Sequence, residues 1–84
     1  MTDLEYDILD ELYFLLSFES IINKLNLKED TCKNALKGLH QKEWIKCYES
    51  AIMEPFSEVP DFESNYKKYY YLATKAGLLA HNSK

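Results

Sequence analysis

The chain has 84 residues, of which 46% are hydrophobic, 14% aromatic and 29% charged, with a formal net charge of −4. This length fits one domain over residues 1–84, and the apolar content excludes a disordered or low-complexity chain. No apolar run approaches the roughly 18 residues of a membrane span, and no basic stretch precedes an apolar core as in a signal peptide. With only two cysteines, we expect free thiols and a cytoplasmic location.

The first half of the chain has the periodicity of helices. Apolar residues recur at three- and four-residue steps over 3–14, and the acids between them cluster in the first turns, where negative charge complements the helix dipole. Ser17 can accept a hydrogen bond from an unpaired amide, so it predicts the start of a second helix over 18–25. After a tight turn at Asn26, a third helix is predicted over 29–42.

The second half of the chain has a different pattern. Over 44–50 the period changes to two, which predicts a strand. Prolines and other turn formers over 51–65 predict a loop or an irregular hairpin connection. The aromatic run over 66–73 predicts a second strand, and Thr74 can cap a last helix over 75–80.

The predicted elements make an α+β fold, in which the apolar sides of the helices and strands form the core. The predicted core residues are Leu9, Leu12, Ile21, Ile22, Leu25, Cys32, Leu36, Leu39, Ile45 and Leu72. Cys47 is also expected to point inward, where a thiol acts as a small apolar group.

Charge is segregated along the chain. Residues 1–23 hold six acids and no base, whereas residues 24–46 hold six lysines and three acids. Residues 47–65 hold five acids and no base, and residues 66–84 hold four lysines and no acid. Every base is lysine, so the bidentate guanine contact of arginine is absent, although lysine can still bind phosphate.

The third predicted helix carries the sharpest candidate for a binding site. Helical spacing puts Lys33, Asn34 and Lys37 on its outward face, where asparagine can pair with adenine and lysine with guanine or phosphate. Further lysines are expected to contact phosphates, one at the helix start and two on the second strand: Lys28, Lys67 and Lys68. The alternatives are an ordinary solvated helix face and a lysine pair that protects an exposed strand edge from aggregation.

Two stretches resemble a known family. Residues 21–45 resemble the helix-turn-helix of winged-helix regulators of the MarR and ArsR type, and residues 70–77 resemble the Y-x-L-T-x-x-G stretch of their second wing strand. The matching residues in the first stretch are Leu25, Leu27, Thr31, Cys32, Leu36, Leu39 and Ile45. The resemblance implies a winged helix with three N-terminal helices, a two-stranded wing and a short C-terminal helix. It also implies a small bacterial DNA-binding transcription regulator whose third helix enters the major groove of double-stranded DNA.

Other features favour a protein-interaction or dimerisation module of the same fold. Glu43 stands where the family usually has the glycine that closes the recognition helix, and Glu29 and Asp30 stand where its DNA-reading members usually have Ser, Thr, Gln or Arg. The wing is acidic, which would repel a duplex; its acids are Glu49, Glu54, Glu58, Asp61 and Glu63. The same region has more aromatic side chains than a two-stranded ribbon can easily bury, so we expect some to close over the first helix and any remainder to suit a partner or a weak homodimer: Tyr48, Phe56, Phe62, Tyr66, Tyr69 and Tyr71.

No residue pattern predicts catalysis, a metal site or a cofactor. His40 and His81 have no cysteine or carboxylate at a recognised ligand spacing, so we expect both to be structural or solvent-exposed. Cys32 lacks the neighbouring thiol that an ArsR-type metal site would need. We therefore expect no enzymatic activity.

Overall fold

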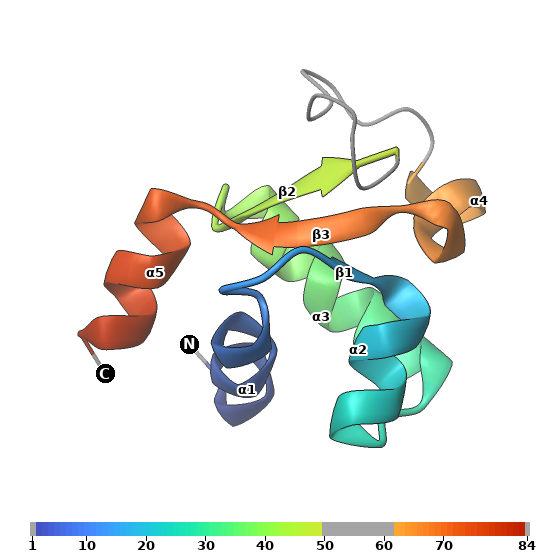
Figure 1. Cartoon of the computed structure of the whole chain (residues 1–84), viewed down its shortest axis with the longest axis horizontal. Helices are drawn as coiled ribbons and strands as arrows, with labels where there is room; N and C mark the ends of the chain where they lie inside the picture. The colour runs from blue at the N-terminus through green and yellow to red at the C-terminus, as the bar shows by residue number, and fades with distance from the viewer. Residues whose placement is uncertain (1, 50–61, 84) are drawn as a thin grey trace.

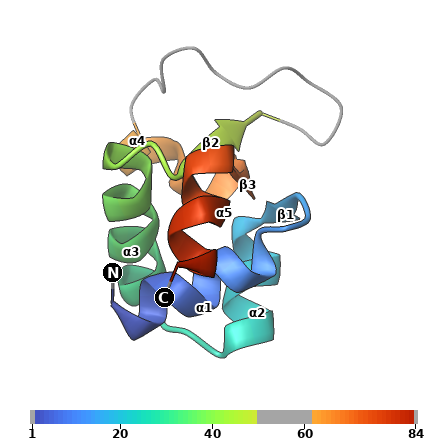
Figure 2. The ribbon, with the colours of Figure 1, turned by 90° about the vertical axis from the view of Figure 1, so that its left-hand side faces the viewer.

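The computed structural model of the chain describes residues 2–49 and 62–83, and the α+β class predicted from the sequence is confirmed. In chain order the elements are α1 (Asp3–Glu11), β1 (Leu16–Ser17), α2 (Phe18–Leu25), α3 (Glu29–Gln41), β2 (Ile45–Tyr48), α4 (Phe62–Asn65), the 3-10 helix η1 (Tyr66–Lys68), β3 (Tyr70–Ala73) and α5 (Lys75–Asn82). The strands form an antiparallel sheet in the order β1-β3-β2. This sheet lies across α1, α2 and α3 (Figure 1), and α5 lies beside α1 at one end (Figure 2).

The first helix, α1, begins with a capping box. Thr2 Oγ1 accepts a hydrogen bond from the Glu5 amide (3.1 Å), and the Glu5 carboxylate accepts one from the Thr2 amide (3.0 Å). The helix ends at Glu11, so its predicted extension to residue 14 is wrong. The cause is a tertiary contact, because the Leu12 carbonyl accepts a hydrogen bond from the Ala73 amide of β3 (3.0 Å), and the chain turns there towards the sheet.

The predicted caps of α2 and α5 are confirmed. Ser17 Oγ accepts a hydrogen bond from the Ser20 amide (3.1 Å), and Thr74 Oγ1 accepts one from the Gly77 amide (3.0 Å). The predicted bounds of α2 are also confirmed, and α3 ends one residue before its predicted end. Among the described residues, no helix has the length and apolar character to cross a membrane.

Between the first helix and the last one, β2 (Ile45–Tyr48) is shorter than the strand predicted over 44–50, and three further features differ from the prediction. β1 is only two residues long, too short to give a periodic signal, and it pairs with β3. Residues 62–65 form a helix in place of a loop, while the predicted loop over 51–61 lies outside the described residues. Residues 66–68 form η1 in place of a strand, because this turn carries the Tyr66 ring into the core. There it lies edge-on to the Phe18 ring, with the two ring centroids 5.0 Å apart.

The core confirms most of the predicted positions and corrects one. Seven predicted residues have exposed fractions of 2% or less: Leu9, Leu12, Ile21, Cys32, Leu36, Leu39 and Ile45. Ile22 and Leu25 are partly buried and pack against this core. Leu72 is the wrong prediction, because side chains alternate along β3 and Tyr71, paired with the buried Cys47, takes the inward position.

The corner between α3 and β2 is closed by a left-handed residue. Glu43 has a φ of 63°, its amide donates to the His40 carbonyl (2.9 Å), and the Trp44 amide donates to the Leu39 carbonyl (3.0 Å), the hydrogen bonds of a Schellman motif. Glutamate therefore takes a conformation that glycine adopts at lower cost. The Trp44 carbonyl then accepts a hydrogen bond from the Thr74 amide (2.9 Å), which joins this corner to the start of α5.

Candidate nucleic-acid interface

The helix α3 has one side in the core and one side that faces outward. Leu36 and Leu39 are fully buried and hold the helix against the rest of the fold. Asn34 and Lys37 are exposed on the outward side, and Lys33 is half-buried beside them. The three polar residues that the sequence groups on one face of this helix therefore do lie on its outward side.

A carboxylate from α4 binds both lysines of this face. One Glu63 oxygen lies 2.7 Å from Lys33 Nζ, and the other oxygen contacts Lys37 Nζ. Lys33 Nζ also lies over the Tyr66 ring, 5.3 Å from its centroid. Hydrogen bonds from Lys33 and then Lys37 lower the pKa of Glu63 to about 2, and the Glu63 hydrogen bond raises the pKa of Lys33. We refer to Lys33, Lys37 and Glu63 as the lysine clamp.

A second carboxylate, Glu29 at the start of α3, binds the segment that carries Lys67. Lys67 Nζ lies 2.9 Å from one Glu29 oxygen, and the Tyr66 hydroxyl donates to the other at 2.9 Å. These two hydrogen bonds, from Lys67 and then Tyr66, lower the pKa of Glu29. Lys67 and Lys68 were expected on the second wing strand, which is wrong, because both lie in η1 where the chain bends to bury Tyr66.

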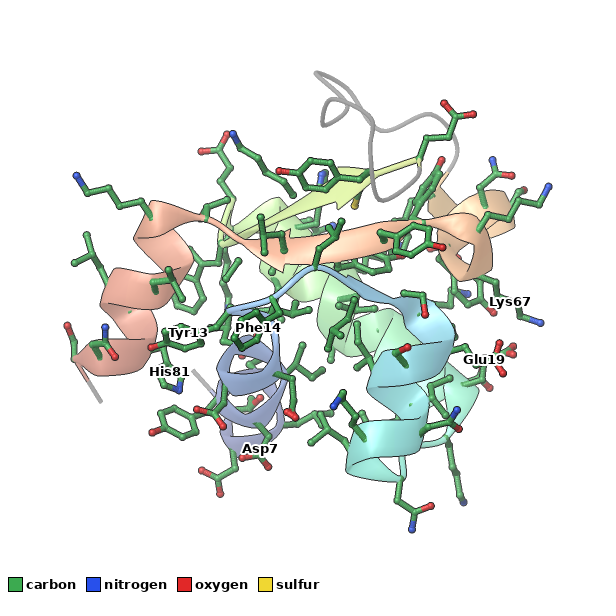
Figure 3. The ribbon with its side chains drawn as sticks, in the orientation of Figure 1. Asp7, Tyr13, Phe14, Glu19, Lys67 and His81 are labelled. Carbon is green, nitrogen blue, oxygen red and sulfur yellow. The ribbon has the colours of Figure 1, made fainter. Side chains whose placement is uncertain are left out.

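The region around Lys67 includes a small groove where α2, α3 and η1 meet. It is lined by Phe18, Glu19, Ile22, Glu29 and Lys67. Glu19 and Lys67 lie at the same end of the molecule, as Figure 3 shows. The groove therefore has acids on two sides of one lysine, which makes it a poor site for an anion.

The remaining predicted contacts are exposed. Lys28 occupies the N-cap position of α3 and makes no side-chain capping hydrogen bond. Lys68 is exposed in η1, and Asn34 is exposed in the middle of α3. Within residues 2–49 and 62–83, Lys28 and Lys68 have no carboxylate partner, so they can meet a phosphate without giving up an ion pair.

The side chains of His81, Cys32 and Cys47 are buried. His81 is 7% exposed and stacks on Tyr6 with a centroid distance of 4.2 Å. Its Nδ1 lies 3.3 Å from the Tyr13 hydroxyl, and the two side chains meet where α1 faces α5 (Figure 3). Burial raises the pKa of the Cys32 and Cys47 thiols to about 12, the opposite of what a reactive cysteine needs.

In the part of the chain that the structure describes, no group of three or more His, Cys, Asp or Glu side chains could hold a metal ion. His81 has Asp10 as its acidic neighbour, with Nε2 3.3 Å from Asp10 Oδ1, but this nitrogen makes no hydrogen bond among the described residues. The stacking of His81 on the half-buried Tyr6 ring fits a role in packing α5 against α1.

The roles of Glu29, Glu63 and Tyr66 were not predicted from the sequence. Glu63 is 26 and 30 residues from the lysines it binds, so no local spacing connects them. The available signal was the alternation of acidic and basic blocks, which predicts attraction between blocks but no particular pair.

No family model matches the chain, and no curated protein or solved structure is detectably similar to it.

Proposed function

We propose that this chain is a winged-helix DNA-binding protein that regulates transcription, with α3 in the major groove of double-stranded DNA. The observation that carries the proposal is the outward side of α3, where Lys33, Asn34 and Lys37 lie together on a helix held by the core. An amide and two cations on one helix face can meet both base edges and phosphates.

The arrangement of the elements supports this proposal. Three residues, 26–28, join α2 to α3, and Asn26 adopts the left-handed conformation (φ 53°) that lets the chain turn sharply between two helices. β2 and β3 pair antiparallel after α3, where a winged helix has its wing. β1, between the first two helices, adds a third strand to this pair.

The proposed contacts divide into base and phosphate contacts. Asn34, near the middle of the exposed helix side, would pair with adenine, while Lys33 and Lys37 would meet guanine or phosphates. Lys28 and Lys68 would hold the backbone. The logarithm of the association constant for DNA should fall by roughly 0.9 for each tenfold rise in salt concentration and for each phosphate that a lysine neutralises.

Binding to mixed-sequence duplex DNA at about 20 mM salt, where screening is weak, tests the proposal. The variant Lys33→Gln/Lys37→Gln should bind the duplex more weakly than the wild type and keep its fold, because both side chains reach solvent. A matched control is Lys24→Gln/Lys75→Gln, which removes the same charge at exposed positions on α2 and α5. Failure of the wild type to bind, or equal losses in both double variants, would contradict a specific role for α3.

A protein-interaction or dimerisation module is the second candidate, and exposed aromatic side chains favour it. Phe14 is 77% exposed and Tyr13 44% exposed on the turn after α1, and Leu79 on α5 is 59% exposed. Such side chains are enriched where proteins bind each other. Sedimentation of the purified chain at high concentration, with Phe14→Ser beside the wild type, tests this role. A mass of one chain for both proteins would contradict dimerisation.

The proposed role includes no enzymatic activity and no bound cofactor. Binding to DNA requires only positively charged and hydrogen-bonding side chains on an exposed helix. Metal analysis of the purified protein is a direct check, and stoichiometric zinc that resists dialysis would contradict it.

A further inference from the structure

Glu63 lies where an anionic ligand of α3 would bind. Its two carboxylate oxygens face two lysines that are four residues apart on the helix, and each oxygen contacts one Nζ. We propose that Glu63 holds the place of a DNA phosphate in the lysine clamp, so that the free protein masks its own DNA contacts. This inference rests on the proposed function, and it adds the way in which the binding site is regulated.

A carboxylate and a backbone phosphate offer the same chemistry to this clamp. Both present oxygens that share a negative charge, and both accept charge-assisted hydrogen bonds from ammonium groups. The lysine clamp is therefore already arranged for an anion, and the ligand has only to replace Glu63. Lys33 is held most firmly, with 24% of its side chain exposed and its Nζ over the Tyr66 ring.

The exchange needs a movement of the Glu63 side chain and no unfolding of the segment that carries it. Tyr66, three residues further on, is 9% exposed and edge-on to Phe18 at 5.0 Å. Its carbonyl accepts a hydrogen bond from the buried Tyr71 hydroxyl at 2.8 Å. The backbone of η1 thus stays fixed to the core, while the Glu63 side chain, 49% exposed, can turn into solvent.

Masking of this kind lowers the affinity for DNA by a predictable amount. A phosphate must first displace two surface ion pairs, and the displaced carboxylate then remains near the duplex. Exposed ion pairs of this kind are weak, and two of them correspond to about a 3- to 10-fold change in affinity at low salt. The masking should also weaken as salt rises, since salt screens exposed pairs.

The test compares variants in their affinity for a labelled mixed-sequence duplex of about 20 base pairs, long enough for one protein, at about 20 mM salt. Glu63→Gln keeps the size of the side chain and removes its charge, so it should bind about 3- to 10-fold more tightly than the wild type. The matched control is Glu19→Gln, which removes an exposed charge at the same end of the molecule but contacts neither Lys33 nor Lys37. Thermal melting of each variant, followed through Trp44 fluorescence, checks that the fold is kept.

A second comparison separates the clamp from a general effect of charge. In the background Lys33→Gln/Lys37→Gln, Glu63→Gln should gain no more affinity than Glu19→Gln gains in the wild type, because no clamp remains to be freed and only general charge repulsion is relieved. The proposal is overturned if Glu63→Gln binds like the wild type, if Glu19→Gln gains as much, or if the full gain persists without the two lysines. If Glu63→Gln binds like the wild type, the masking proposal fails but the proposed DNA-binding function is not contradicted. If neither the wild type nor Glu63→Gln binds the duplex, the proposed function itself fails and the exchange fails with it.

Discussion

Replacing Gly77 by alanine tests the contact between α5 and the corner after α3. A Cβ at this position would lie 2.1 Å from the Trp44 carbonyl oxygen and 3.0 Å from the Trp44 carbonyl carbon, which are both backbone atoms. To relieve this clash the backbone must move by about 1 Å, because non-bonded carbon and oxygen atoms rarely approach closer than about 3.3 Å. The same carbonyl accepts the 2.9 Å hydrogen bond from the Thr74 amide, so the movement weakens that bond as well.

The expected loss of stability combines the cost of overpacking, the cost of the weakened hydrogen bond and the gain in helix propensity from alanine. Overpacking costs about 1–3 kcal/mol and a lost hydrogen bond about 1 kcal/mol, while the gain in helix propensity is below about 1 kcal/mol. Gly77→Ala should therefore lower the free energy of unfolding by about 1–3 kcal/mol. For a domain of this size, that corresponds to a Tm about 4–24 °C lower.

Gly38→Ala is the matched control, because a Cβ at Gly38 would meet only a Glu5 carboxylate oxygen, at an ordinary 3.7 Å. Gly38 lies inside α3, so alanine should stabilise the fold by about 0.5–1 kcal/mol. Heating both variants while following circular dichroism and the fluorescence of Trp44, the single tryptophan, measures the two effects. An unchanged Tm for Gly77→Ala would refute the reasoning, since α5 would then not approach the Trp44 carbonyl so closely.

Three further predictions follow from strain, charge and burial. Glu43→Gly should raise the free energy of unfolding by about 0.5–1 kcal/mol, because glycine adopts the φ of 63° without the steric cost; a lower Tm would contradict this. The pKa of Glu63 falls from 4.5 to about 2 in the folded chain, so its ion pairs add stability at neutral pH that is lost as pH falls through this range. Denaturant titrations between pH 4.5 and 2 should show the wild type losing more stability than Glu63→Gln, and parallel losses would contradict the ion pairs. Burial raises the pKa of Cys32 and Cys47 to about 12, so both thiols should react with a thiol reagent at pH 8 far more slowly in the native protein than in denaturant; equal rates would contradict their burial.

Features that depend on neighbouring residues were predictable from the sequence. Ser17 and Thr74 cap their helices because a hydroxyl reaches an amide only three residues away. Features that depend on which face meets the core were only partly predictable. Three consecutive tyrosines conceal the alternation of β3, so Leu72 was assigned to the core, whereas the buried residue is Tyr71. The contact between Glu63 and the outward side of α3 was not predictable, because it depends on how the burial of a side chain three residues further along bends the chain.

The segregation of charge along the sequence has a structural counterpart in pairs between different blocks. Lys42 of the first lysine-rich block pairs with Glu5 of the first acidic block at 2.8 Å, and Lys33 of the same block pairs with Glu63 of the second acidic block. Lys67 of the last block pairs with Glu29. The positive charge open to a duplex is therefore smaller than the number of lysines indicates.

This pairing changes what determines affinity in the proposed function. A lysine that leaves a carboxylate for a phosphate exchanges one anion for another, so its net gain is small. Lys28 and Lys68 gain a full phosphate contact, because they have no carboxylate to leave in the part of the chain described. We therefore expect Lys28→Gln to weaken DNA binding more than Lys67→Gln does, although each variant removes one positive charge. Equal losses in the duplex-binding assay would mean that internal ion pairs do not limit the interface.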